Sequence, residues 1–159
     1  HEPEGGGESI SVFESGAILL YLAEKYEQFL PTDQRLRIQA IEWLMWQMGG
    51  LGPMLGQNHH FNRYAPEDVS YAIKRYSEET LRLYAVLNRR LIGRDYIAGS
   101  YSIADIAVYP WVNRYEWHKT DIDRFPEVKR WYQAIGVRAG VVRAYDEAKT
   151  INAGNVTSD

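Results

Sequence analysis

The stretch ISVFESGAILLYLAEKY, from Ile10 to Tyr26, sets the fold prediction because its hydrophobic period changes at one point. Residues 10–13 are a short apolar run, which predicts a β-strand. From Ser15 onward, apolar residues recur every three or four positions, as on one face of a helix. A strand that leads directly into a helix leaves unpaired N–H groups at the positive end of the helix dipole. The junction at Glu14 and Ser15 is therefore a candidate anion site.

Downstream of this junction the hydrophobic pattern is helical throughout. The glycine-rich residues 49–53 are expected to bend, kink or interrupt one of these helices. A single strand cannot satisfy its own backbone, so the strand at the start needs neighbours from elsewhere. The predicted fold class is mainly α. The expected helices after the first one span residues 34–48, 66–91, 102–117, 126–135 and 141–149.

Composition excludes several classes of function. The 159 residues suffice for one hydrophobic core, and 45% hydrophobic with 25% charged residues is usual for a globular domain. A net charge of −3 with mixed signs offers no basic surface for nucleic acid. The absence of cysteine excludes disulfides, thiolate metal sites and a cysteine nucleophile, and it fits a cytoplasmic location. No apolar run approaches the roughly 20 residues that span a bilayer, so we expect no membrane partner.

The residue types at the Glu14-Ser15 junction suit one kind of ligand. The Ser15 hydroxyl can cap the helix and also donate to a bound carboxylate, while the Glu14 carboxylate can accept from an ammonium group. A ligand that carries both groups on one carbon, the head of an amino acid, matches the pair. The alternative is that Ser15 is only an N-cap and Glu14 only a favourable charge near the helix start.

Three long motifs resemble a known family. Glu14-Ser15 followed by GAILLYLAEKY resembles the end of the thioredoxin-like domain of cytosolic glutathione transferases. IEWLMWQMGGLGPMLGQNHHF and YSIADIAVYPWV are similar to the bacterial nu-class enzymes of the disulfide-bond oxidoreductase type, relatives of the fungal nitrogen-catabolite regulator. The resemblance implies a remnant of the thioredoxin-like, glutathione-binding domain over residues 1–28 and an all-helical domain over 34–150. The polar residues 151–159 are expected to form a flexible tail.

The resemblance also implies ligands and partners. It makes Glu14 and Ser15 the residues that hold the γ-glutamyl head of glutathione, which is a substrate of this family. The family pattern YAIxRY, matched by YAIKRY at residues 71–76, makes Arg75 a ligand of a glutathione carboxylate, acting across a homodimer. The alternative for Arg75 is a solvated ion pair with Glu78 or Glu79 on the same helix.

The implied activity is a glutathione-dependent disulfide-bond reduction or conjugation of glutathione to electrophiles. Glutathione supplies the thiolate, so the lack of cysteine is compatible with it and argues against a glutaredoxin-like or omega-class mechanism. The activating Thr or Asn and the cis-proline of the family are expected upstream of His1, so no catalytic residue is assigned here. Without most of the thioredoxin-like domain, Ile18, Leu19 and Leu22 would leave apolar surface exposed, which predicts aggregation or an unusual dimer. The alternative function is a non-catalytic binding or regulatory module.

Two further clusters carry predictions. Asn58, His59 and His60 are implied by the resemblance to lie near the electrophile side of the cleft, where they can hydrogen-bond a second ligand; a structural role is equally consistent. Adjacent histidines on a helix point about 100° apart and chelate poorly, so no metal is expected. Ser102 and Asp105 have the spacing of a capping box, and loss of Asp105 should cost about 1 kcal/mol or more.

The aromatic residues are predicted to fill the core, with one or two lining the cleft. They are Trp43, Trp46, Tyr109, Trp111 and Trp117.

Overall fold

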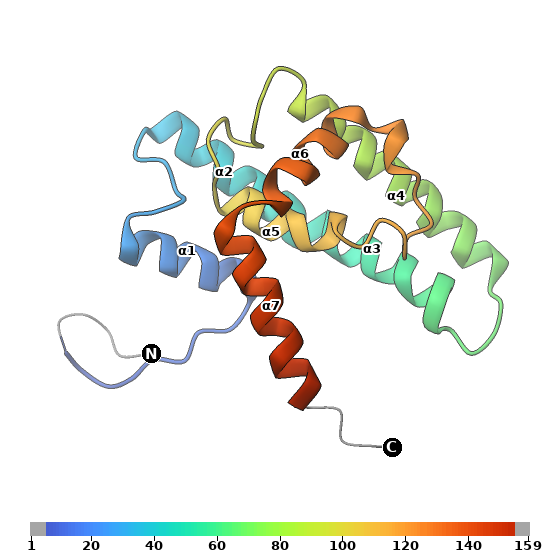
Figure 1. The fold of residues 1–159 in the computed structure, drawn as a ribbon, viewed down its shortest axis with the longest axis horizontal. Coiled ribbons are helices and arrows are strands. Elements are labelled where there is room, and N and C mark those ends of the chain that lie inside the picture. Colours follow the sequence, from blue (N-terminus) through green and yellow to red (C-terminus); the bar gives the residue numbers. More distant parts are fainter. Residues whose placement is uncertain (1–5, 155–159) are drawn as a thin grey trace.

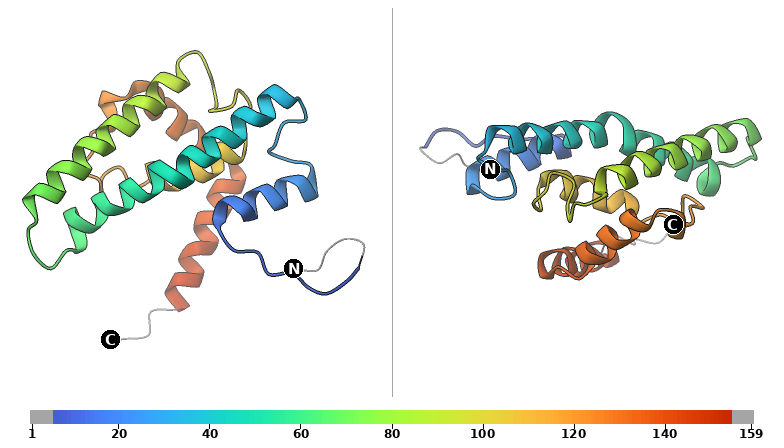
Figure 2. Two further views of the ribbon diagram at one scale, coloured as in Figure 1. Left: turned by 180° about the vertical axis from the view of Figure 1, so that it is seen from behind. Right: turned by 90° about the horizontal axis from the view of Figure 1, so that it is seen from above.

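Helix α5 lies at the centre of the structure, a computed structural model that describes residues 6–154 (Figure 1). Seen from above, α5 is sandwiched between a layer that holds α2, α3 and α4 and a layer that holds α6 and α7 (Figure 2). The helices are α1 (Ser15–Tyr26), α2 (Gln34–Trp46), α3 (Gly52–His59), α4 (Ser70–Leu91), α5 (Ile103–Val112), α6 (Pro126–Gly136) and α7 (Ala139–Gly154). Short π-helical turns at Gln47–Leu51 and His60–Tyr64 and a 3-10 turn at Ile122–Arg124 connect them.

Two groups of buried side chains hold the layers together. The larger joins α3, α4, α5 and α6, and its largest fully buried members are Trp131 and Tyr84. The smaller joins α1 and α2 to α5, through residues such as Ala23, Leu44 and Ile103. Because burial of apolar surface is the main stabilising term, α1 is attached to the bundle by the smaller share of the core.

The predicted strand at residues 10–13 is wrong. These residues are irregular, and Phe13 is 80% exposed. Two isolated bridges, Tyr96 with Gly99 and Ala98 with Ser100, are the only β-pairs in the described part of the chain. An apolar run becomes a strand only when a neighbour takes up its backbone hydrogen bonds, and residues 6–154 provide none.

The apolar surface predicted on α1 is present in part. Ile18 and Leu22 are 36% and 40% exposed, whereas Leu19 packs against the smaller core. Whether this surface causes aggregation or dimerisation stays a prediction.

The glycine-rich segment does not break the helix. It forms the π-helical turn Gln47–Leu51, after which α3 continues with Pro53 in its first turn, where proline is tolerated. Helix α4 begins at Ser70, four residues later than predicted, because residues 65–69 reverse the chain so that α4 can pack beside α3. Figure 2 shows this pair running side by side.

The ends of the last helices also differ from prediction. Helix α5 contains Pro110 but stops at Val112, followed by turns instead of a helix to residue 117. Helix α7 runs to Gly154, into the predicted tail over 151–159. The first five residues of the predicted 1–28 unit, and residues 155–159 of that tail, lie outside the described residues.

The capping box is confirmed. The Ser102 hydroxyl accepts from the backbone N–H of Ala104 at 3.3 Å, and the Asp105 carboxylate accepts from the backbone N–H of Ser102 at 3.0 Å. Asp105 is fully buried and also accepts from the N–H of Ile97 at 3.0 Å and from the indole of Trp131 at 2.8 Å. Burial raises the pKa of Asp105, and its hydrogen bonds oppose that shift. One carboxylate thus closes the helix N-terminus and ties α5 to α6.

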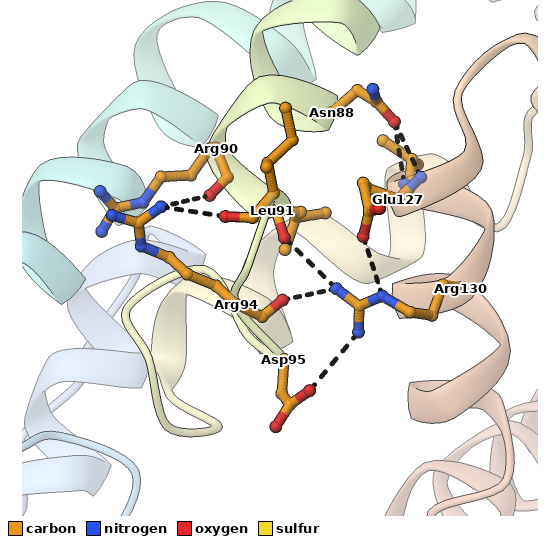
Figure 3. A network of polar contacts seen from close by, with 9 residues as sticks. Asn88, Arg90, Leu91, Arg94, Asp95, Glu127 and Arg130 are labelled. Carbon is orange, nitrogen blue, oxygen red and sulfur yellow. Dashed lines mark hydrogen bonds and ion pairs between the residues drawn. The ribbon is translucent and has the colours of Figure 1, made fainter.

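A second polar network links the end of α4 to the start of α6 (Figure 3). The Asn88 side-chain oxygen accepts from the N–H of Glu127 at 2.9 Å and so caps the start of α6. Arg130 donates to the carbonyl oxygens of Leu91 and Arg94 and to the Glu127 carboxylate. These contacts tie the end of α4 and the turn after it to α6.

Candidate functional site

A pocket of about 580 Å³ lies between the N-terminal half of α1 and the C-terminal half of α5. It draws side chains from α1, the π-helical turn, α3, α5 and the turn after α5. Its lining residues are Ser15, Ile18, Leu19, Gln47, His59, Ile106, Ala107, Pro110, Trp111 and Arg114.

The N-terminus of α1 forms one edge of this pocket and has no side-chain cap. The N-cap residue is Glu14, not Ser15, so the predicted capping role of Ser15 is wrong. Glu14 has φ 68° and ψ 116°, a conformation that costs a residue with a Cβ about 1–3 kcal/mol. Within residues 6–154, the one hydrogen-bond contact of the Ser15 hydroxyl is with the sulfur of Met48, at 3.5 Å. The N–H groups of the first turn have no acceptor within the helix, so this end is open to an anion.

Trp111 forms the opposite wall, and the glycine-rich segment makes room for it. A Cβ on Gly52 would lie 3.0 Å from the Trp111 Nε1 and 2.7 Å from the Gln47 Nε2. The Gln47 amide would have to move and the Trp111 contact would be tighter than most side-chain contacts, so a residue larger than glycine would disturb this wall. The tight packing fixes the width of the pocket on that side.

His59 lines the pocket and is one member of a buried histidine pair. Its ring stacks on that of His118, with centroids 4.4 Å apart, and the Nε2 atoms of both rings are buried without a hydrogen-bond partner. Burial lowers the pKa of His59, the positive charges of Arg114 and Arg63 lower it further, and a hydrogen bond with the Arg114 backbone opposes them. Burial, followed by His59 and Arg114, lowers the pKa of His118 to about 3. Both rings are therefore neutral at pH 7.

Of the three residues predicted for a second-ligand cleft, His59 alone lines this pocket. Asn58 is fully buried, and its amide donates to the Thr80 hydroxyl at 2.7 Å and to the His118 carbonyl at 3.4 Å. These bonds fasten α3 to α4, which is a structural role. His60 is exposed and packs edge-on against Phe61.

Arg75 lies on α4 and lines a different pocket, of about 630 Å³, together with Tyr71 and Arg82. One chain therefore does not bring Arg75 and Ser15 into one pocket. The expected ion pair is also not formed: Glu79 holds Arg82 through two bonds of 2.7 Å, and Glu78 lies 3.9 Å from Lys74. Within residues 6–154, no carboxylate lies at ion-pair distance from Arg75.

Sequence reasoning missed Gln47 and Arg114 as pocket residues. Gln47 was hidden inside an apparently ordinary helix, and only the π-helical turn directs it to the pocket. The signal for Arg114 was its spacing: Trp117 follows three residues later, and its ring lies 4.0 Å from the guanidinium carbon of Arg114.

Residues 6–154 contain neither a metal-binding cluster nor a membrane-spanning helix. No three His, Asp or Glu side chains gather closely enough to hold a metal ion. None of the helices there is long and apolar enough to cross a membrane.

Residues 58–138 match the family model of the glutathione S-transferase C-terminal domain. The chain is 53% identical over 150 residues to the disulfide-bond oxidoreductase YfcG of Escherichia coli, covering 94% of this chain and 70% of that protein.

Two solved structures are also similar. A glutathione transferase from Burkholderia graminis, with two glutathione molecules per subunit, is 46% identical with a TM-score of 0.78, over 85% of this chain and 60% of that one. The Saccharomyces cerevisiae regulator URE2 in complex with glutathione is 33% identical with a TM-score of 0.78, over 84% and 65% of the two chains. The chain thus spans less than two thirds of each of these two solved relatives. By sequence and by fold, it belongs to the glutathione transferase family, among the nu-class-like members.

Proposed function

We propose that this chain is part of a glutathione-dependent disulfide-bond reductase, which can also conjugate glutathione to electrophiles. The observation that carries the proposal is the open N-terminus of α1, with Ser15 at the edge of a largely apolar pocket. The similar proteins support it, since YfcG is named a disulfide-bond oxidoreductase and the solved relatives hold glutathione.

The proposed ligand at α1 is the γ-glutamyl head of glutathione. Its carboxylate would accept from the free N–H groups of the first turn and from the Ser15 hydroxyl, a favourable place for an anion. Its ammonium group would donate to the exposed carboxylate of Glu14. The unfavourable backbone conformation of Glu14 supports a functional role, because such conformations concentrate at ligand sites.

Arg75 would complete this site from a second copy of the chain. Its guanidinium is exposed and has no carboxylate partner in the described part of the chain, so it is available for a carboxylate of glutathione. Because Arg75 and Ser15 line separate pockets, the proposal requires a homodimer.

The proposed reaction is two successive thiol–disulfide exchanges. One glutathione thiolate attacks a sulfur of the substrate disulfide, forms a mixed disulfide and releases one substrate thiolate. A second glutathione thiolate attacks the glutathione sulfur of the mixed disulfide and releases the other substrate thiolate. The products are glutathione disulfide and two thiols. The residues of this chain bind and orient glutathione, and the apolar walls exclude water.

This assignment includes location and domain organisation. We place residues 1–28 in a thioredoxin-like glutathione-binding unit and residues 34–150 in the helical domain. Reduction by glutathione fits the cytoplasm, where the glutathione pool is reduced.

The test is turnover by the full-length protein from the same gene. With glutathione and bis(2-hydroxyethyl) disulfide, we expect glutathione disulfide to form, and Ser15→Ala to lower kcat/KM at least tenfold. Asp33→Asn is the control: Asp33 caps α2 and does not line the pocket, so this variant should retain activity. Turnover that is absent in the full-length protein, or unaffected by Ser15→Ala, would refute the proposal.

A second candidate is a non-catalytic regulatory module, favoured by the similarity to URE2, which is named a transcriptional regulator. It predicts that the full-length protein binds glutathione without forming glutathione disulfide.

A further inference from the structure

The pocket beside α1 has an uneven charge distribution. Among the described residues that line it, Arg114 alone carries a formal charge; the others are apolar side chains, Ser15, Gln47 and the neutral His59. A pocket of this kind favours a ligand that is apolar over most of its surface and negatively charged at one point.

Arg114 is held in place by an aromatic ring and not by a carboxylate. Its guanidinium carbon lies 4.0 Å from the centroid of the Trp117 ring, a cation–π contact. No carboxylate in residues 6–154 lies at ion-pair distance from Arg114. Its hydrogen-bond donors thus remain available, and the stacking reduces the entropy lost when they bind a carboxylate.

The neighbours of Arg114 increase the positive potential. Arg63 lies over the same Trp117 ring, with its guanidinium carbon 4.3 Å from the centroid, and it too has no acidic partner in the described part of the chain. The buried His59 is neutral and hydrogen-bonds to the Arg114 backbone, so it does not offset the charge of Arg114. An anion at Arg114 would therefore meet two positive charges and no opposing carboxylate.

We propose that Arg114 is a specificity-determining residue that selects disulfides or electrophiles carrying a carboxylate away from the reacting atom. This inference rests on the proposed function and extends it to the co-substrate. Helix α1 would hold glutathione at one edge of the pocket, and Arg114 would hold the anionic end of the second substrate from the opposite side. A charge-assisted bond of this kind corresponds to about a tenfold to hundredfold gain in affinity.

The first experiment needs neither glutathione nor turnover. Two fluorescent probes share an aryl skeleton: 8-anilinonaphthalene-1-sulfonate is an anion, and N-phenyl-1-naphthylamine is neutral. For residues 1–159 we expect Arg114→Gln to weaken binding of the sulfonate about tenfold or more. The affinity for the neutral probe should change by less than twofold. Arg114→Lys should recover part of the lost sulfonate affinity. Arg63→Gln is the matched control, because it removes the other charge over Trp117 from outside the pocket lining.

The outcomes separate the two proposals. Equal loss of both probes in Arg114→Gln, or equal loss of sulfonate binding in Arg63→Gln, would overturn the role of Arg114 whether or not the protein turns over glutathione. In the full-length protein, we expect kcat/KM for 3,3′-dithiodipropionate relative to bis(2-hydroxyethyl) disulfide to fall about tenfold in Arg114→Gln. An unchanged ratio would also overturn it. Absence of all turnover would refute the proposed function, and the probe result would still decide on Arg114.

Discussion

The N-termini of α5 and α1 are built in opposite ways. At α5, Ser102 and Asp105 are fully buried, and the Asp105 carboxylate accepts from two backbone N–H groups and the Trp131 indole. At α1, Glu14 is exposed, has φ 68° and makes no side-chain cap. One end is closed by the chain itself, and the other leaves its donors unused beside a pocket. The first end stabilises the fold, and the second is the end at which we propose that a ligand binds.

The largest expected effect is at the closed end. Asp105→Ala should lower the free energy of unfolding by about 3 kcal/mol, because it leaves several buried donors without an acceptor. The matched control is Asp33→Ala, which removes an exposed N-cap that accepts from Arg35 and Leu36, and should cost about 1 kcal/mol. Urea unfolding measures both. Equal losses would show that burial adds nothing to the cap at α5.

The loss of stability at low pH is expected to come from a buried histidine and not from either helix N-terminus. The pKa of His118 is lowered to about 3 in the folded chain from an ordinary value of 6.5. Between these pH values the unfolded chain binds more protons, so stability should fall as the pH falls through this window, by about 3 kcal/mol from pH 7 to pH 4. His118→Gln, which cannot titrate, should flatten this dependence in urea unfolding at several pH values. An unchanged slope would assign the acid sensitivity to other groups.

The backbone at Glu14 gives a smaller effect. Glycine adopts positive φ without a Cβ clash, so Glu14→Gly should be about 1 kcal/mol more stable than Glu14→Ala. Both variants lack the carboxylate, so the difference in their urea midpoints reports backbone strain alone. If alanine is as stable as glycine there, the conformation of Glu14 is unstrained and offers no support for a ligand site.

Features set by neighbouring residues were predictable from sequence. The Ser102–Asp105 box needs only four consecutive residues, and the apolar period of α1 gave its bounds from Ser15 to Tyr26. The strand at residues 10–13 failed because strand formation depends on a partner distant in sequence. The start of α4 failed because the chain reversal before Ser70 is set by packing against α3.

Pocket residues that belong to a recognisable sequence motif could be predicted. Ser15 and His59 were found from motifs, and both line the pocket. Asn58 was misplaced because the helical phase that buries it against Thr80 depends on two π-helical turns. Arg114 was missed because its spacing to Trp117 hints only at an aromatic contact, while the lack of a carboxylate partner within residues 6–154 depends on the three-dimensional packing.

The most direct measurement compares two peptides by isothermal titration of the full-length protein. Glutathione carries a γ-glutamyl head, and cysteinylglycine lacks it. If the unpaired amides at Ser15 hold that head, glutathione should bind at least tenfold more tightly than cysteinylglycine, and Ser15→Ala should remove most of this advantage while leaving the melting temperature unchanged. Equal affinities for the two peptides, or a preference for glutathione that survives Ser15→Ala, would contradict the proposal that the N-terminus of α1 binds the γ-glutamyl head.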